Sequence, residues 1–191
     1  MNLKGTKTEQ NIKMALAGES IARNKYTYFA EQAKKEGNTE LVEMYERLAR
    51  NEATHAKLWY IALHGAIPDS VQNLRTAATG EFEEWSHMYP DFAKTAREEG
   101  LEQMAVMFEH VAEIEKNHEK QFMEAIIKQT KQSSTQSALT EKEKQFIEDT
   151  QPMQKTKGYR CAFCGATYDH RPDVCTVCQA IGSFDVCTIS K

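Results

Sequence analysis

Apolar residues recur through the first 130 positions at alternating steps of three and four, a pattern typical of helices packed side by side in a bundle. The pattern predicts four helices, at about residues 8–36, 39–64, 70–99 and 101–129. Gly37, Gly65 and Gly100 follow the first three and are predicted to end them, Gly37 as a left-handed cap. The expected fold class is therefore an all-α four-helix bundle in residues 1–130.

Beyond residue 130 the helical pattern is lost. Residues 131–156 are rich in Gln, Ser, Thr and Lys and are predicted as a linker that includes Ser133-Ser134-Thr135. Thr140 and Glu143 resemble a capping box, which predicts one short helix inside this linker. Residues 157–191 hold short β-prone pieces around all five cysteines, and we predict a small β-rich second domain there.

The four predicted helices are two copies of one hairpin. The segment 29–37 matches 92–100, 63 residues later, and Glu52 and His55 match Glu115 and His118 at the same spacing.

Glu19 and Glu81, in contrast, match at a spacing of 62 residues, so the third helix holds one extra residue between Glu81 and Phe92. A helix usually absorbs an inserted residue as a π-bulge. We predict a bulge there that brings Glu84 to the site, and a kink at Pro90.

Each of the four apolar stripes carries an acid at mid-helix. A single such charge is commonly a rim residue, but five carboxylates in one core would repel each other unless cations balance them. One Glu from each of two helices and Glu-x-x-His from the other two is the ligand pattern of dimetal sites in ferritin-like bundles. Oxygen-rich donors favour iron or manganese. The candidate metal ligands are Glu19, Glu52, His55, Glu81, Glu84, Glu115 and His118.

The C-terminal domain, residues 157–191, carries two Cys-x-x-Cys pairs, Cys161 with Cys164 and Cys175 with Cys178, and we call it the four-cysteine domain. In a reducing compartment this spacing indicates metal ligation rather than disulfides. Four thiolates predict a tetrahedral site for iron or zinc. Cys187 has no partner in the pattern and is predicted to be a small buried residue in the last strand.

Composition excludes several other classes of function. The net charge is −4 and there is no long basic run, so no nucleic-acid partner is expected. The sequence shows neither an apolar leader nor an apolar run of membrane-spanning length, so we expect a soluble cytoplasmic protein without a membrane partner.

Over its whole length the chain resembles the rubrerythrins. The motifs that carry this resemblance are Gly18-Glu19-Ser20-x-Ala22-Arg23, Glu52-x-x-His55, Gly80-Glu81-x-x-Glu84, Met88-Tyr89-Pro90, Glu115-x-x-His118 and the two cysteine pairs. The resemblance implies two irons in a ferritin-like bundle and one iron in a rubredoxin-like four-cysteine domain, with manganese and zinc as the respective alternatives.

The resemblance also implies roles for individual residues. Glu52 and Glu115 would bridge the two irons. Glu19, Glu81 and His55 would be terminal ligands. One iron would exchange His118 for Glu84 when it is oxidised. Tyr26 and Tyr89 match tyrosines beside the ligands in that family, although both are also ordinary core aromatics in the helical pattern. The candidate catalytic residues are Glu84, His118, Tyr26 and Tyr89.

The implied function is a peroxidase that reduces hydrogen peroxide to water in oxidative stress defence. Its electrons would come from NADH through a separate reductase or a rubredoxin, since the chain has no dinucleotide-binding glycine fingerprint. The alternatives are a ferroxidase or iron-storage protein, a zinc-stabilised binding module, and a manganese enzyme with catalase-like activity.

The connection between the second and third helices is short. These helices run parallel in ferritin-like bundles, so the chain must travel about 35 Å between them, whereas residues 65–69 span at most about 18 Å. We therefore predict a domain-swapped homodimer. The linker, with a root-mean-square span of about 28 Å if flexible, could carry the four-cysteine domain to the partner's dimetal site.

Overall fold

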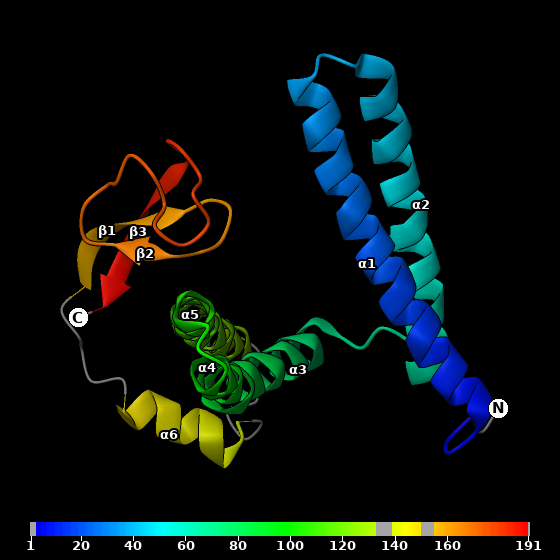
Figure 1. The fold of residues 1–191 in the computed structure, drawn as a ribbon. Coiled ribbons are helices and arrows are strands. Elements are labelled where there is room, and N and C mark those ends of the chain that lie inside the picture. The colour runs from blue at the N-terminus through cyan, green and yellow to red at the C-terminus, as the bar shows by residue number, and fades with distance from the viewer. Residues whose placement is uncertain (1–2, 133–138, 150–154, 191) are drawn as a thin grey trace. The chain divides into compact units, whose positions relative to one another are not determined.

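The structure is a computed structural model that describes residues 3–132, 139–149 and 155–190. The chain divides into two compact units, Met1–Pro68 and Asp69–Lys191. The first unit is a helical hairpin, and the second holds another helical hairpin, a short helix and a small sheet (Figure 1). None of the described helices is both long and apolar enough to cross a membrane.

The first unit consists of α1 (Lys7–Lys35) and α2 (Thr39–His64), which lie side by side (Figure 1). The Thr6 side chain accepts a hydrogen bond from the Glu9 backbone N–H, and the Asn38 side chain accepts one from Leu41, so both helices begin at a polar cap. Gly37 between the helices has a φ of 72°, which confirms its predicted left-handed conformation.

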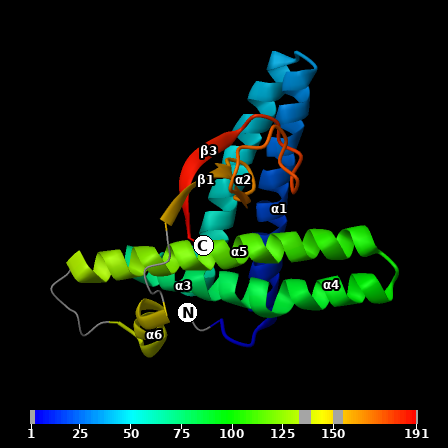
Figure 2. The ribbon, with the colours of Figure 1, turned by 90° about the vertical axis from the view of Figure 1, so that its left-hand side faces the viewer.

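The helical hairpin of the second unit is interrupted where the extra residue was expected. Its first arm consists of α3 (Ser70–Glu83), the π-helix η1 (Glu84–Met88) and α4 (Tyr89–Glu98). The second arm, α5 (Glu102–Gln132), runs back beside them (Figure 2). The π-helix confirms the predicted bulge. Pro90 lies at the start of α4, directly after the bulge, where its missing N–H is tolerated.

The short helix α6 (Glu141–Asp149) confirms the element predicted inside the linker. The Thr140 N–H donates to Glu143 Oε2 at 2.6 Å and the Glu143 N–H donates to Thr140 Oγ1 at 3.3 Å, which is the reciprocal capping box. Phe146 packs against a buried cluster of Ala78, Met123 and Ile126 from α3 and α5. The predicted Ser133-Ser134-Thr135 stretch lies outside the described residues.

The sheet has the order β2-β1-β3, with antiparallel pairing throughout. Its strands are β1 (Lys155–Cys161), β2 (Thr167–Tyr168) and β3 (Phe184–Ser190). They confirm the predicted β-rich segment, except that β1 begins at Lys155, inside the predicted linker of residues 131–156. Cys187 lies in β3 opposite Gly158. It is only partly buried, so the prediction of a buried residue was wrong; Gly158 opposite it has no side chain to cover it.

Candidate metal centres

The first unit brings together three of the predicted ligands. Glu19 comes from α1, and Glu52 and His55 lie one turn apart on α2. His55 Nδ1 lies 2.8 Å from Glu52 Oε2 and 3.9 Å from Glu19 Oε2. One potential ligand atom from each of the three residues lies within 4.8 Å of the others. The hairpin therefore holds a compact Glu, Glu, His triad.

The helical hairpin of the second unit repeats this arrangement. Glu81 comes from α3, and Glu115 and His118 come from α5. His118 Nδ1 lies 2.6 Å from Glu115 Oε2 and 3.8 Å from Glu81 Oε2, and the three groups again fall within 4.8 Å of one another. The internal repeat seen in the sequence is thus a repeat of geometry as well.

Aromatic residues follow the same repeat. In the first unit the ring centroids of Tyr26 and Tyr45 lie 6.3 Å apart, and Phe29 meets Tyr45 at 5.5 Å. In the second unit Tyr89 and Phe108 lie 6.2 Å apart, and Phe92 meets Phe108 at 5.6 Å. Tyr45 and Phe108 are 63 residues apart, the spacing of the internal repeat, and this spacing was the signal in the sequence for these equivalent contacts.

In the second triad the ionised carboxylate groups repel one another. Burial, followed by the nearby charge of Glu115, raises the pKa of Glu81 to about 7, and Glu84 adds to the effect. Burial and the charges of Glu115, Glu84 and Glu81 also raise the pKa of Tyr89, so its hydroxyl keeps its proton. A divalent cation between the carboxylates would relieve this repulsion, and the two carboxylates and one imidazole of each triad suit iron or manganese.

Glu84 occupies the first position of the π-helix but is not one of the three groups that meet within 4.8 Å in the described part of the second unit. The neighbouring Trp85 donates its Nε1–H to Glu119 Oε2 at 2.8 Å. Glu119 also pairs with Lys142 of α6 at 3.0 Å, and Lys142 lies over the Phe82 ring at 3.8 Å from its centroid. These contacts link the π-helix to α6, and no pattern in the sequence indicated them.

The four cysteines of the two Cys-x-x-Cys pairs converge, with their Sγ atoms within 4.8 Å of one another. The Sγ atoms of Cys161 and Cys178 lie 3.6 Å apart, and those of Cys164 and Cys175 also lie 3.6 Å apart. Tetrahedral coordination with metal–sulfur bonds of about 2.3 Å requires sulfur–sulfur distances of about 3.8 Å. The cysteines therefore fit a bound iron or zinc ion.

Hydrogen bonds favour the thiolate form of Cys175, which is the form that binds a metal ion. Burial alone would raise the pKa of Cys175, but donors, among them the backbone N–H of Cys178 and the hydroxyl of Tyr168 at 3.1 Å, lower it to about 6. Burial raises the pKa of Cys164 to about 12. A metal ion is the natural charge partner for such a buried group of thiolates.

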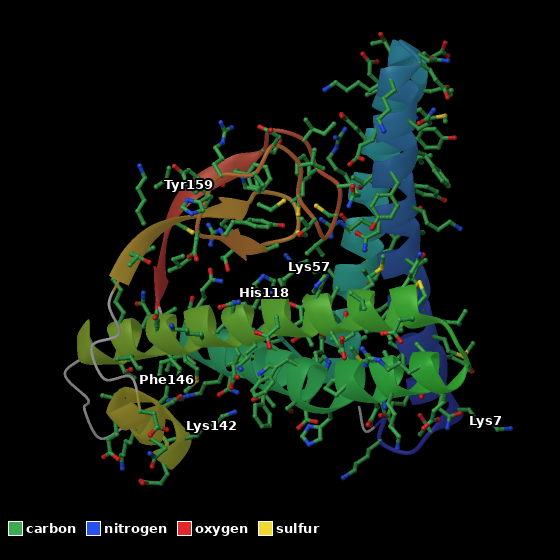
Figure 3. The ribbon with its side chains drawn as sticks, turned by 60° about the vertical axis from the view of Figure 1, so that its left-hand side comes forward. Lys7, Lys57, His118, Lys142, Phe146 and Tyr159 are labelled. Carbon is green, nitrogen blue, oxygen red and sulfur yellow. The ribbon has the colours of Figure 1, made fainter. Side chains whose placement is uncertain are left out.

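The four-cysteine domain contacts α5 of its own unit. Ile114 of α5 belongs to a buried cluster with Cys161, Ala166 and Cys175. Arg160 donates to Gln121 Oε1 at 3.0 Å. Figure 3 shows His118 on α5, next to the four-cysteine domain. The four-thiolate site therefore packs against α5, the helix that carries Glu115 and His118 of the second triad.

Comparisons with known proteins show the family to which the chain belongs. The Rubrerythrin family model matches residues 10–71 and 72–161. Rubrerythrin-1 of Clostridium acetobutylicum is 36% identical over 93% of this chain and 92% of its own length, and the rubrerythrin of Nitratidesulfovibrio vulgaris is 36% identical over the same shares. A structure of fully reduced nigerythrin aligns with 95% of this chain and 87% of its own at 26% identity, with a TM-score of 0.37. On the family match and these relatives, the chain belongs to the rubrerythrin family, whose fold joins a ferritin-like helical bundle to a small rubredoxin-like domain with four cysteine ligands.

Proposed function

We propose that this protein is a non-haem diiron peroxidase that reduces hydrogen peroxide to water and is re-reduced through an iron in its four-thiolate site. Membership of a family known for oxidative stress defence supports this proposal. The observation that carries it is the combination of two matching Glu, Glu, His triads with a four-thiolate site on one chain. This combination suits an oxidoreductase that stores electrons at one metal site and uses them at another.

The residues that would hold the two irons are those of the triads, with Glu84 as an additional carboxylate. When bound, two ferrous ions supply two electrons and the Lewis acidity that cleaves an O–O bond. The chain's own residues orient the site: each His Nδ1 lies within 3 Å of the Glu one turn before it, at 2.8 Å for His55 and 2.6 Å for His118. Tyr89 packs against Phe92 and Phe108 beside the acids and keeps its phenolic proton near them.

The four-cysteine domain distinguishes this function from iron storage. A ferroxidase or storage protein needs the carboxylate site but has no use for a four-thiolate site that packs against one of its ligand-bearing helices. In the peroxidase, the four thiolates would hold an iron, which would supply one-electron redox chemistry for re-reduction by a separate NADH-dependent reductase or a rubredoxin. A zinc-stabilised binding module would instead leave the two triads without a role.

We also propose that the working form is a domain-swapped homodimer. Phe29 in the first hairpin is 42% exposed and Phe92 in the second is 45% exposed, although both lie on the apolar stripes predicted to face a bundle core. Helix α2 ends at His64 and helix α3 begins at Ser70, so the connection between them is as short as predicted. Exchange of hairpins between two copies would bury these stripes and complete two dimetal sites.

The experiment that tests the peroxidase is anaerobic reduction followed by rapid mixing with hydrogen peroxide. We expect reoxidation of both irons by one equivalent of peroxide, faster than by oxygen at the same concentration. A matched variant, Cys164→Ser, should retain this step but lose re-reduction through the four-thiolate site. Faster reaction with oxygen together with a hollow cage of many copies would favour iron storage, and zinc at both sites would favour the binding module.

A further inference from the structure

We propose that Trp85 and Glu119 are positioning residues for Glu84. The hydrogen bond between them, which we call the π-helix anchor, holds η1 against α5 and thereby keeps the Glu84 carboxylate beside the second triad. Lys142 of α6 supports this anchor. The inference rests on the proposed function, in which Glu84 is an additional carboxylate for one of the two irons.

The backbone of η1 does not by itself fix where Glu84 points. The Tyr89 N–H donates to the Glu84 carbonyl, five residues back instead of the four of an α-helix. One inserted residue also turns the side chains that follow it by about 100° relative to α3. Side-chain contacts between η1 and α5 are therefore needed to set the rotation of this segment.

The π-helix anchor joins the neighbours of two candidate ligands. Trp85 directly follows Glu84, and Glu119 directly follows His118. The indole Nε1–H donates to Glu119 Oε2 at 2.8 Å, and the Glu119 side chain is only 12% exposed. A hydrogen bond to a largely buried carboxylate is stronger than one in water, because water competes little for it. The anchor thus connects η1 to α5 next to the triad.

Two lysines and one aromatic ring hold the anchor in place. The rings of Phe82 and Trp85 meet edge to face, with centroids 5.5 Å apart and planes at 88°. Lys116 lies over the Trp85 ring, 5.3 Å from its centroid. Lys142 lies over the Phe82 ring at 3.8 Å, and its amine is 3.0 Å from Glu119 Oε1. Both oxygens of Glu119 therefore have a partner, which fixes the orientation of the carboxylate.

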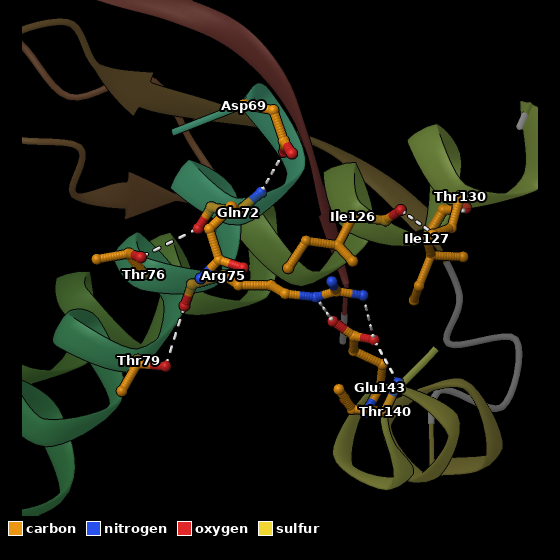
Figure 4. A network of polar contacts seen from close by, with 10 residues as sticks. All are labelled: Asp69, Gln72, Arg75, Thr76, Thr79, Ile126, Ile127, Thr130, Thr140 and Glu143. Atoms are coloured by element: carbon orange, nitrogen blue, oxygen red, sulfur yellow. Dashed lines mark hydrogen bonds and ion pairs between the residues drawn. The ribbon is translucent and has the colours of Figure 1, made fainter. Parts of the chain in front are cut away.

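Helix α6 is attached where Lys142 can make these contacts. Glu143, the next residue, accepts hydrogen bonds from Arg75 of α3 with both carboxylate oxygens, at 2.8 and 3.3 Å (Figure 4). Phe146, one turn later, packs against the buried cluster of α3 and α5. All of these residues belong to the second unit, so the anchor and its support are complete within one unit.

Glu84 lies near the acids that it would assist. Burial is the main cause of the raised pKa of Glu81 and of Tyr89, and the negative charge of Glu84 adds to both shifts. Adjacent residues of a helix point in different directions, so Trp85 can reach Glu119 while Glu84 lies near Glu81. A rotation of η1 would move both side chains together.

The first hairpin lacks the anchor as well as the extra glutamate. Ala56 corresponds to Glu119 at the spacing of 63 residues, and Ala22 or Arg23 corresponds to Trp85, according to the spacing used. These residues cannot form an indole-to-carboxylate bond. Helix α1 also passes through this region without a π-helix. The anchor therefore occurs in the half that has both the bulge and Glu84, as expected if it serves to place that glutamate.

The test is a double-mutant cycle between Trp85→Phe and Glu84→Gln in the full-length protein. Phenylalanine keeps an aromatic ring beside Phe82 but removes the N–H donor. The four-thiolate site is first filled with Zn²⁺, and Co²⁺ is then titrated and its binding followed by calorimetry. Glu84→Gln identifies the cobalt ion that Glu84 contacts.

We expect Glu84→Gln to weaken binding of one cobalt ion per chain about tenfold, and Trp85→Phe to weaken the same ion about threefold. In the Glu84→Gln background Trp85→Phe should have no further effect, because Trp85 acts through Glu84. An equal effect of Trp85→Phe in both backgrounds would show that it only stabilises the helix and would overturn the proposal. Unchanged cobalt binding in either single variant would also overturn it.

A second pair of variants keeps the test decisive if Trp85→Phe does not fold. Glu119→Gln and Glu119→Leu remove the same charge, but only glutamine keeps an oxygen that accepts the indole N–H. We expect Glu119→Gln to bind cobalt about threefold more tightly than Glu119→Leu. Equal affinities in these two variants would contradict the role of the anchor.

The part assigned to α6 is tested by Lys142→Gln, with Lys144→Gln as its matched control. Both lysines are about half exposed, but Lys144 pairs with Glu141 of its own helix. We expect weaker cobalt binding in Lys142→Gln only, and equal affinities in the two variants would exclude α6 from the support. Because no step uses peroxide, these outcomes do not depend on whether the peroxidase assignment holds.

Discussion

Replacing Glu143 by alanine should release α6 from the helical hairpin of the second unit. The Glu143 side chain is 4% exposed and pairs with Arg75, while its capping-box bonds to Thr140 begin the helix. A helix of nine residues has little stability of its own in water. Its persistence therefore depends on its contacts with the hairpin, namely this ion pair, the packing of Phe146, and the contacts of Lys142 with Glu119 and Phe82.

The magnitude follows from the burial of the two partners. Removing one partner of a buried ion pair costs about 3–5 kcal/mol. Arg75 remains 29% exposed, so its charge regains part of its hydration when Glu143 is lost. We therefore expect a smaller loss of about 2 kcal/mol in the free energy of local opening. That loss corresponds to about 30-fold faster hydrogen exchange in α6.

Hydrogen exchange measured by mass spectrometry on residues 141–149 is the assay. Glu141→Gln is the matched control, because Glu141 lies on the same helix and its replacement removes the same charge, but its side chain is 89% exposed and pairs with Lys144. We expect less than a twofold change for this control. Equal exchange in Glu143→Ala and Glu141→Gln would refute the reasoning.

The same contact predicts a pH dependence. Burial alone would raise the pKa of Glu143, but its hydrogen bonds to Arg75 and Thr140 lower it below the ordinary value of 4.5. A lowered pKa in the folded state means that the stabilisation is fully present above pH 4.5 and is lost as the pH falls through the folded pKa. Exchange in α6, corrected for its intrinsic pH dependence, should therefore rise below pH 4.5 in the wild type and change little in Glu143→Ala.

Three further predictions concern metal binding and assembly. Phe92→Ala should weaken the dimer at least tenfold in sedimentation experiments, because a swapped dimer would bury this half-exposed ring; an unchanged dissociation constant would argue against the swap. Cys178→Ser should lose the thiolate-bound metal, whereas Cys187→Ser should keep it, as judged by metal analysis; equal metal content in both would remove Cys178 from the ligand set. Glu52→Ala should lower iron binding outside the four-thiolate site by at least one equivalent per chain, and Glu46→Ala, an exposed change on the same helix, should not; retained stoichiometry in Glu52→Ala would count against a bridging role.

Local patterns in the sequence were enough to predict the helices and strands. The stripe spacing placed α2 at residues 39–64, and the capping box of Thr140 and Glu143 predicted α6. The change of spacing from 62 to 63 residues between Glu81 and Phe92 predicted the π-helix. These features depend on neighbours within one or two turns, so a single sequence contains the information.

Contacts between distant segments were not predictable in the same way. Arg75 and Glu143 lie 68 residues apart, and many other charged pairs on the two helices could have been proposed with equal reason. The hydrogen bond between Trp85 and Glu119, 34 residues apart, likewise depends on how the π-helix lies on α5. No periodicity encodes such contacts, because they are decided by the fit of side chains between segments that fold separately.

The π-helix Glu84–Met88 also makes the two halves of the duplicated hairpin chemically different. Without it, each half would offer the same three groups, two Glu and one His, to a bound ion. The position in α1 that corresponds to Glu84 holds Ile21 or Ala22, according to the spacing used, and neither can bind a cation. One inserted residue therefore gives the second half a carboxylate that the first half lacks, so that the surroundings of the two triads differ in negative charge.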